Sequence, residues 1–309
     1  MANMKDNPMF PSKVLVVIAI LVAFALRAYH LAQPPLSWDE GWSIGLSTLS
    51  WAEINRITAL DVHPPLYYDL FKLWLALGKH ELLLRFLSVI TGILTVPLAY
   101  ITGRAWRDER VGILAAFVTA LSPFLIYYSQ VARMYSLCAA LSLLATYCLL
   151  KAIEGDRIPY YAGFVLSAVA ALYTFYYTAC ILAAALIYAL LTRPRRWRAL
   201  LTSTIAIALL YAPWFLYAVP PMLARVGSRT GFALGGADVL RFLADGLFGL
   251  VFAYGTGWSA VYVNVALLIV GLLLAWCRRE SVRCLVLPLL AIALTLAAVS
   301  AGAKAHMFA

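Results

Sequence analysis

The chain has 309 residues, of which 64% are hydrophobic and 12% are charged, and its formal net charge is +10. A soluble domain of this composition would expose larger apolar patches than soluble monomers tolerate, so that class is excluded. The positive charge does not indicate nucleic-acid binding, because Lys and Arg form short clusters between apolar runs, where membrane-topology signals belong. We expect one all-α domain, residues 1–309, that is a polytopic bundle of transmembrane helices.

A membrane-spanning helix needs roughly 20 mostly apolar residues, and about nine stretches of this chain come close to that requirement. In chain order the predicted spans are Val14–Leu31, Leu82–Gly103, Val111–Tyr128, Met134–Ile153, Tyr160–Tyr176, Thr178–Leu191, Leu200–Val219, Trp258–Cys277 and Leu285–Ala301. The spans Tyr160–Tyr176 and Thr178–Leu191 are predicted to form a tight hairpin.

The distribution of Lys and Arg predicts an N-terminus on the cytoplasmic side. With that orientation, the arginine-rich loops around 104–110 and 193–198 lie inside, and the segments 32–81, 129–133 and 220–257 lie outside. Treating Pro64–Gly78 as a further span would invert everything after it and place the arginine-rich loops outside. The positive-inside rule disfavours that alternative.

Two short helices are predicted in the first outer segment. Ser50 and Glu53 have the spacing of a capping box, which predicts a helix that lies on the membrane from Trp51. Pro64 and Pro65 suit the start of a second helix that runs to Gly78. Because this second run is short for a span and carries two charges, we expect an interfacial helix whose aromatic residues anchor it at the lipid surface.

Polar side chains from two outer segments are predicted to meet at one membrane surface, where they would suit an anionic lipid substrate. A group-transfer enzyme needs a base for the acceptor and a cation for the departing phosphate, roles that Asp39 or Glu40 and Arg133 can fill. The same residues also have plain structural interpretations, as solvated loop acids, a histidine that braces a helix, and an arginine that faces lipid headgroups. The candidates are Asp39, Glu40, Asp61, His63, Tyr67, Tyr68, Gln130, Arg133 and Tyr135.

The order of three motifs resembles the protein O-mannosyltransferase superfamily of GT-C glycosyltransferases. These motifs are the acidic pair Asp39–Glu40, the run DVHPPLYY from Asp61, and the run YYSQVARMYSL from Tyr127. The superfamily includes the lipid A aminoarabinose transferases and bacterial lipopolysaccharide-core sugar transferases. The resemblance covers roughly residues 10 to 155 and implies that relatives continue beyond the point where this chain ends.

The resemblance implies a glycosyltransferase that moves a sugar from a polyprenyl-phosphate donor to a lipid, glycan or protein acceptor at the outer face of the cytoplasmic membrane. It makes Asp39 the catalytic base, Glu40 its partner, and Arg133 an arginine near the carrier phosphate. We expect His63, Tyr67, Tyr68, Gln130 and Tyr135 to bind substrate. No cofactor is certain, since two acids alone do not define a site for Mg²⁺ or Mn²⁺. A flippase for lipid-linked sugars and an inactive truncated relative are the alternatives.

Overall fold

The computed structural model describes residues 11–61 and 63–227 of the chain. Within these residues the secondary structure is helical, with α1 to α11 and one short 3₁₀ helix, η1, so the all-α prediction is confirmed. The two predicted spans after residue 257, and the predicted outer loop from residue 228 onward, lie outside the described residues.

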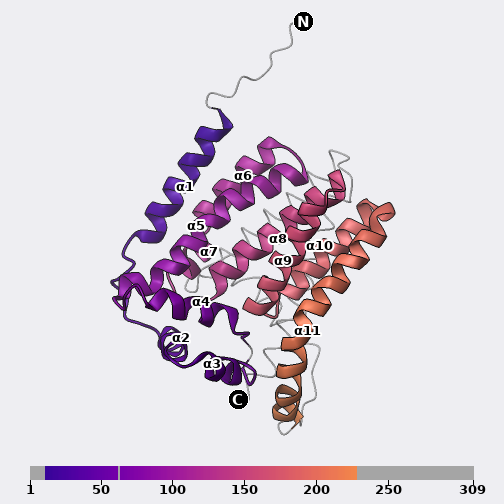
Figure 1. The fold of residues 1–309 in the computed structure, drawn as a ribbon. Coiled ribbons are helices and arrows are strands. Elements are labelled where there is room, and N and C mark those ends of the chain that lie inside the picture. Colours follow the sequence, from indigo (N-terminus) through magenta and orange to yellow (C-terminus); the bar gives the residue numbers. More distant parts are fainter. Residues whose placement is uncertain (1–10, 62, 228–309) are drawn as a thin grey trace, which may run out of the picture.

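The helices of the bundle follow the predicted spans closely and lie side by side (Figure 1). Among the described residues, the helices α5, α8 and the stretch Pro194–Ala218 are long and apolar enough to cross a membrane. The helices α6 and α7 meet the same criteria only as a pair, which is bent by 58° as in a broken span or a re-entrant loop. The helices α9 and α10 are shorter and form the predicted hairpin, which turns at residues 175–177. Their bounds are α1 Ser12–Ala28, α5 Glu81–Trp106, α6 Glu109–Leu121, α7 Pro123–Ser129, α8 Tyr135–Gly155, α9 Ile158–Thr174, α10 Thr178–Thr192, η1 Pro194–Arg196 and α11 Trp197–Gly227.

The last described helix differs from its prediction at one end. Helix α11 continues to Gly227, although the sequence predicted a loop from Pro220. Pro220 and Pro221 lie inside this helix together with Pro213. A proline removes one backbone hydrogen bond of a helix but does not always end it, so the rule that placed the boundary at Pro220 failed here.

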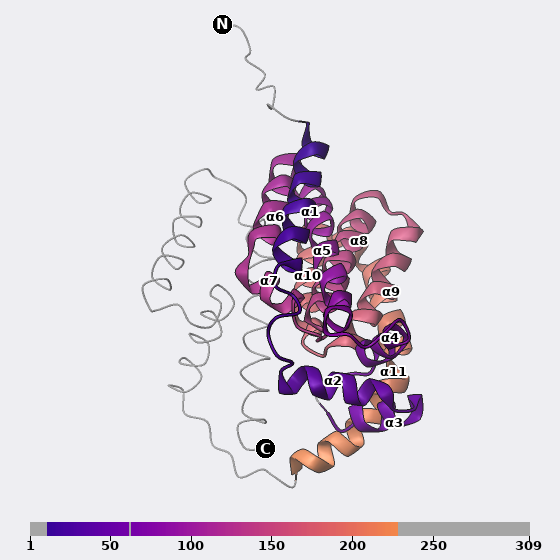
Figure 2. The ribbon, with the colours of Figure 1, turned by 90° about the vertical axis from the view of Figure 1, so that its left-hand side faces the viewer.

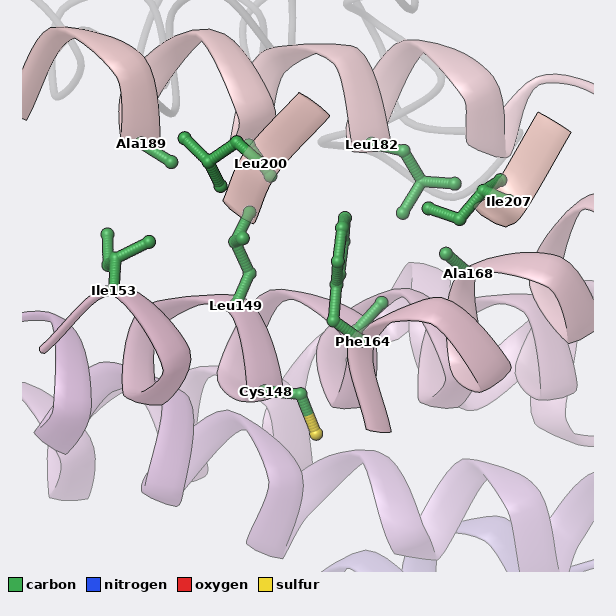
Figure 3. Packing of buried hydrophobic residues seen from close by; sticks show 11 residues of the cluster. Cys148, Leu149, Ile153, Phe164, Ala168, Leu182, Ala189, Leu200 and Ile207 are labelled. Carbon is green, nitrogen blue, oxygen red and sulfur yellow. The ribbon is translucent and has the colours of Figure 1, made fainter. Parts of the chain in front are cut away.

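Small and branched apolar side chains hold α8, α9, α10 and α11 together (Figure 3). Phe164 of α9 is fully buried at the centre of this cluster and is surrounded by Leu149, Leu182 and Ile207. Alanines such as Ala168 and Ala189 line the same interfaces. Close packing through small residues is the usual way in which helices associate in a membrane, because lipid offers no hydrophobic force between them.

Three short helices lie across one end of the bundle, as the two perpendicular views show (Figures 1 and 2). Their bounds are α2 Trp38–Thr48, α3 Trp51–Thr58 and α4 Leu66–Leu75. The prediction of α3 is confirmed together with its capping box, since Glu53 N–H donates to Ser50 and the Glu53 carboxylate accepts from Ser50 N–H. The prediction of α4 is confirmed, but the helix ends at Leu75, before Gly78.

The aromatic residues of α4 were expected to face the lipid surface, but most of them face the interior of the protein. Tyr67, Tyr68 and Phe71 are at most 1% exposed, whereas Leu73 is 61% exposed. The aromatic face therefore packs inward against Leu84 of α5 and the segment after α7, and Leu70 and Leu73 face outward. The prediction of interfacial aromatic anchors in α4 was wrong for these three residues, because a pattern of apolar positions does not say which of two apolar faces is the buried one.

Candidate functional site

The acidic pair begins a helix that the sequence analysis treated as a loop. Ser37 is the N-cap of α2: its hydroxyl accepts from Glu40 N–H, and the Glu40 carboxylate accepts from Ser37 N–H at 2.9 Å. This capping box places both acids in the first helical turn, where the positive end of the helix dipole favours carboxylates. Asp39 is exposed, while Glu40 is buried, with 2% of its surface exposed. The two neighbouring acids therefore have opposite environments.

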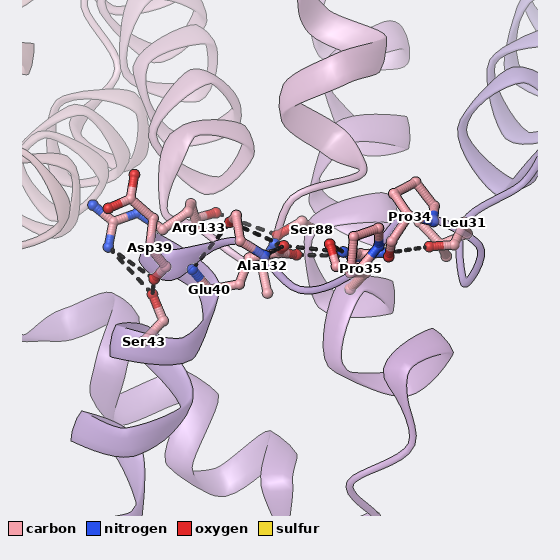
Figure 4. Close-up of polar contacts among 11 residues, drawn as sticks. Leu31, Pro34, Pro35, Asp39, Glu40, Ser43, Ser88, Ala132 and Arg133 are labelled. Atoms are coloured by element: carbon pink, nitrogen blue, oxygen red, sulfur yellow. Dashed lines mark hydrogen bonds and ion pairs between the residues drawn. The ribbon is translucent and has the colours of Figure 1, made fainter.

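Glu40 forms a buried two-pronged ion pair with Arg85 of α5, and Figure 4 shows its carboxylate beside Ala132. The Nε–Oε1 distance is 2.7 Å and the Nη2–Oε2 distance is 3.0 Å. Burial alone would raise the pKa of the Glu40 carboxyl, but hydrogen bonds from Arg85, Ser37 and Ala132 outweigh burial and hold the pKa below its usual value. Glu40 is thus an ionised carboxylate whose two oxygens already have partners.

Arg85 and Glu40 each also hold a further segment of the chain. The Arg85 guanidinium also donates to the carbonyls of Leu31, Pro34 and Pro35 in the loop that leads into α2. Glu40 Oε1 accepts from Ala132 N–H, 3.1 Å away, in the segment after α7. We call Arg85 and Glu40 the clamp: it holds the entry to α2, the first turn of α2 and the segment 130–134 against α5. Sequence reasoning missed the role of Arg85, although an arginine inside a predicted span is itself a signal.

Arg133 lies beside the first turn of α2 and is 4% exposed. Its Nη1 donates to the Asp39 backbone carbonyl at 3.4 Å and to Ser43 Oγ at 3.3 Å, and its Nε has no hydrogen-bond partner among the described residues. Burial alone would lower the pKa of Arg133, but Tyr68, Tyr135 and Asp39 raise it, so the guanidinium stays charged. The contact between the two residues is thus made by the Asp39 backbone carbonyl, and the role of the Asp39 carboxylate beside Arg133 stays a prediction.

Tyrosines from two helices surround Arg133. Tyr67 and Tyr68 have buried hydroxyls that lack hydrogen-bond partners within the described residues. Burial raises the pKa of both hydroxyls, so they remain protonated and can donate. The guanidinium carbon lies 6.0 Å from the ring centre of Tyr135. Buried donors without acceptors are rare in proteins, and oxygen atoms of a ligand or of water can accept from them.

The contacts of His63 and Gln130 lead away from this cluster in part. The His63 Nδ1 is 3.5 Å from Asp61 Oδ2, and its ring stacks on Phe175, which in turn contacts the edge of Tyr135. The Gln130 amide points elsewhere: its Nε2 lies 2.8 Å from the Tyr29 carbonyl at the end of α1. Six of the predicted site residues therefore lie together: Asp39, Glu40, Arg133, Tyr67, Tyr68 and Tyr135. His63 is linked to this group through the ring of Phe175. Gln130 contacts the end of α1 instead.

The donor set near Asp39 does not fit a divalent cation held by both acids. Glu40 uses its oxygens for Arg85, Ser37 and Ala132, which leaves Asp39 as the acid of the pair with an exposed carboxylate. No group of three or more His, Cys, Asp and Glu side chains gathers within residues 11–61 and 63–227. Mg²⁺ is usually bound through one or two carboxylates together with substrate phosphates, so a cation here would depend on Asp39 and the substrate.

An apolar groove of about 620 Å³ runs along the other side of α2. Gly41 and Gly45 form part of its wall, and a Cβ atom added at either glycine would meet no atom within 4 Å. Trp38, next to Asp39 in the chain, is 86% exposed at the edge of the groove. Asp39 thus follows a residue of the groove in the chain, and its backbone carbonyl contacts Arg133. The lining residues are Leu36, Ser37, Trp38, Gly41, Trp42, Gly45, Leu46, Leu49 and Ile57.

A family model described as dolichyl-phosphate-mannose-protein mannosyltransferase matches residues 62–223 of the chain. The match includes Arg85, Arg133 and the tyrosines around Arg133, and it begins after Asp39 and Glu40. No curated protein sequence matches the chain.

Solved structures of three GT-C proteins share the fold of the chain. The S. cerevisiae protein O-mannosyltransferase Pmt1–Pmt2 complex bound to the sugar donor is 20% identical, with a TM-score of 0.51 over 72% of this chain and 35% of that one. The Archaeoglobus fulgidus oligosaccharyltransferase AglB, in complex with an inhibitory peptide and a dolichol-phosphate, is 16% identical, with a TM-score of 0.53 over 91% of this chain and 38% of that one. ArnT from Cupriavidus metallidurans is 16% identical, with a TM-score of 0.52 over 93% of this chain and 59% of that one. The chain thus spans less than two thirds of each of these proteins.

Proposed function

Because this chain belongs to the dolichyl-phosphate-mannose-protein mannosyltransferase family, and is thereby a GT-C glycosyltransferase, we propose that it transfers a sugar from a polyprenyl-phosphate donor. One observation carries the proposal: Arg133 is a buried cation with an unused donor, next to the exposed acid Asp39. A guanidinium in this setting suits a phosphate, which it can bind through two parallel hydrogen bonds. The sugar donor and the dolichol-phosphate named for the yeast and archaeal structures support a lipid-linked donor.

The chemistry that we propose is a single displacement at the anomeric carbon. Asp39 takes the proton of an acceptor hydroxyl as its oxygen attacks the sugar, and the bond from the anomeric carbon to the phosphate oxygen breaks. The lipid phosphate leaves with the electron pair, and Arg133 stabilises its charge with help from Tyr67 and Tyr68. The attack inverts the configuration at the anomeric carbon.

The remaining predicted site residues take different parts in this proposal. Glu40 is a positioning residue, because Arg85, Ser37 and Ala132 already occupy its carboxylate. We assign His63 and Tyr135 to the binding of the sugar, since their rings are linked through Phe175 beside Arg133. Gln130 supports the end of α1 and does not contact the substrate.

We place this site on the outer face of the cytoplasmic membrane. The predicted inside loops around 104–110 and 193–198 join α5 to α6 and α10 to α11, at the opposite end of the bundle from α2, α3 and α4 (Figure 1). These loops carry seven of the arginines between them: Arg104, Arg107, Arg110, Arg193, Arg195, Arg196 and Arg198. Basic loops stay on the cytoplasmic side, which leaves Asp39 and Arg133 outside.

Replacing Asp39 by asparagine is expected to lower transfer by about 10²–10⁴-fold, the usual contribution of a general base, while donor binding stays unchanged. The amide has the same size, and the carboxylate is exposed, so the fold loses no buried contact. The test measures labelled sugar reaching lipid and glycan products in membranes, alongside movement of labelled donor across vesicles. Wild-type transfer by Asp39→Asn would contradict the proposed base. Donor movement without transfer by the wild type would favour a flippase.

The acceptor is proposed to approach Asp39 along the groove on α2. Its lining contains no charged side chain, so the part of the acceptor that enters the groove is apolar. A Cβ atom at Gly45 meets no atom within 4 Å, so the side chain of Gly45→Leu would extend into the groove, and the change would favour the helix. We expect this variant to fold normally and bind donor normally, but to need several-fold more acceptor.

Gly45→Ala is the matched control for the groove, since it gives the same gain in helix propensity with little added volume. We expect its kinetics to match those of the wild type. The apparent KM for the acceptor, measured with membrane extracts of increasing concentration, separates the two variants. An unchanged KM in Gly45→Leu would mean that the acceptor does not bind in this groove.

A further inference from the structure

The bend between α6 and α7 leaves backbone carbonyls without helical donors. Ser122 adopts an extended conformation at the bend, with φ −61° and ψ 116°. In a straight helix the next residue would donate its N–H to the Thr119 carbonyl, but that residue is Pro123, which has none. The last carbonyls of α6, including that of Ala120, also lack helical partners, because no further turn follows to donate N–H groups to them. Orphan carbonyls inside a bundle need another donor.

Arg27, near the end of α1, supplies that donor. Its Nη2 donates to the Thr119 carbonyl and its Nη1 to the Ala120 carbonyl, each at 3.0 Å, and its Nε donates to Ser129 Oγ at 3.2 Å. Ser129 is the last residue of α7, so one guanidinium contacts both arms of the bend. Arg27 is 0% exposed, and a fully buried arginine in a membrane bundle generally has a specific task.

A second contact joins α7 to α1, in which a side chain at the end of α7 donates to the end of α1. The Gln130 side-chain nitrogen lies 3.2 Å from the Arg27 carbonyl and 2.8 Å from the Tyr29 carbonyl, so it caps the end of α1. Helix α5 closes the junction from a third side, because a Cβ atom at Gly92 would overlap the Ser129 side chain. The ends of α1, α6 and α7 are thus fixed relative to one another, and Arg133 follows Gln130 by three residues.

We propose that Arg27 is a positioning residue for Arg133: by holding the bend between α6 and α7, it sets where segment 130–134 presents the guanidinium that binds the lipid phosphate. This inference rests on the proposed function for the role of Arg133, but the control of the bend by Arg27 can be tested separately. A lysine cannot replace Arg27 fully, since its three N–H donors sit on one nitrogen and cannot reproduce the planar fork that reaches two carbonyls and Ser129 through three separate nitrogens.

The bend is measured directly with spin labels on cysteines introduced at Val118 and Tyr127, which are 60% and 56% exposed on α6 and α7. The native cysteines are replaced by alanine, and the protein is reconstituted in nanodiscs. We expect a narrow distance distribution in the wild type and a longer, broader one in Arg27→Met. In the same preparations, Arg27→Met should bind undecaprenyl phosphate roughly tenfold more weakly, and Arg27→Lys should lie between. Arg104→Gln, at an exposed arginine of α5, is the control and should match the wild type in both measurements.

A double variant separates positioning from a purely structural role. Arg27→Met with Pro123→Ala restores an N–H for the Thr119 carbonyl, so the thermal stability should recover, while the labels stay far apart and undecaprenyl phosphate binding stays weak. Recovery of both stability and binding would overturn the proposal, as would an unchanged label distance in Arg27→Met.

Should Arg27→Met fail to fold, Gln130→Met breaks the reciprocal contacts at a half-buried position and should broaden the same distribution. If Arg133→Ala binds undecaprenyl phosphate as the wild type does, the proposed function fails, and the label distances still decide the role of Arg27.

Discussion

Replacing Arg133 by alanine is expected to lower sugar transfer by about 10²–10³-fold or more, since this is the usual cost of removing a group that stabilises transition-state charge. The loss should appear both in undecaprenyl phosphate binding and in the rate of transfer. The physical reason is that Arg133 is the buried cation nearest to Asp39, and its Nε has no partner within the described residues. The measurement is transfer by purified protein in nanodiscs at saturating acceptor.

The stability of Arg133→Ala should stay close to that of the wild type. Arg133 forms no ion pair with an acid in the part of the chain that the structure describes, so its removal strands no buried carboxylate. Arg133→Lys serves as the control for charge, because it keeps the positive charge but loses the planar fork, and it should retain only part of the activity. Equal transfer by the wild type and Arg133→Ala would remove Arg133 from the mechanism.

The sequence predicted the bundle well because its signals are local. Long apolar runs bounded by charges indicate spans, and the charge bias indicates which loops share a side. The two signals together were enough to predict the helices from α5 to α10. They were also enough to predict that Asp39, His63 and Arg133 lie at one end of the bundle. The start of α3 at Trp51 followed from its capping box for the same reason.

The helix α2 could have been predicted with the rule that found α3. Ser37 and Glu40 have the same spacing as Ser50 and Glu53, and both pairs form capping boxes in the structure. The interpretation of Asp39 and Glu40 as a functional pair hid this signal. Glu40 is in fact the member that completes the capping box with Ser37, which leaves Asp39 as the exposed acid of the two.

Partners that lie far apart in the chain could not be predicted from the sequence. Arg85 and Glu40 are separated by 45 residues, and Arg27 and Ser129 by 102. Periodicity and spacing carry no information about such pairs, which depend on how α1, α5 and α7 pack. The buried face of α4 was misassigned for a related reason, since the neighbours that cover Tyr67 and Tyr68 come from other segments.

Breaking the clamp is expected to cost the protein much of its stability, in contrast to the loss of Arg133. Arg85→Met strands the buried Glu40 carboxylate, and Glu40→Gln strands the Arg85 guanidinium, so each single change should destabilise the fold by about 3–5 kcal/mol. The Arg85 and Glu40 side chains are 3% and 2% exposed, which removes the solvent screening that weakens surface pairs. Arg104 and Glu109 provide a matched surface pair, with side chains 61% and 37% exposed, whose disruption should cost about 1 kcal/mol or less.

The double variant Arg85→Met, Glu40→Leu distinguishes the two roles of the clamp. It removes both charges, so the free energy of unfolding, measured by denaturant titration in detergent, should recover most of the loss of either single change. Transfer should not recover, because the loop carbonyls of Leu31, Pro34 and Pro35 and the N–H of Ala132 lose the side chains that hold them. Asp39 and Arg133 would then sit on segments that are no longer fixed to each other. Recovery of transfer together with stability would mean that the clamp only supports the fold, and that the geometry between Asp39 and Arg133 is set elsewhere.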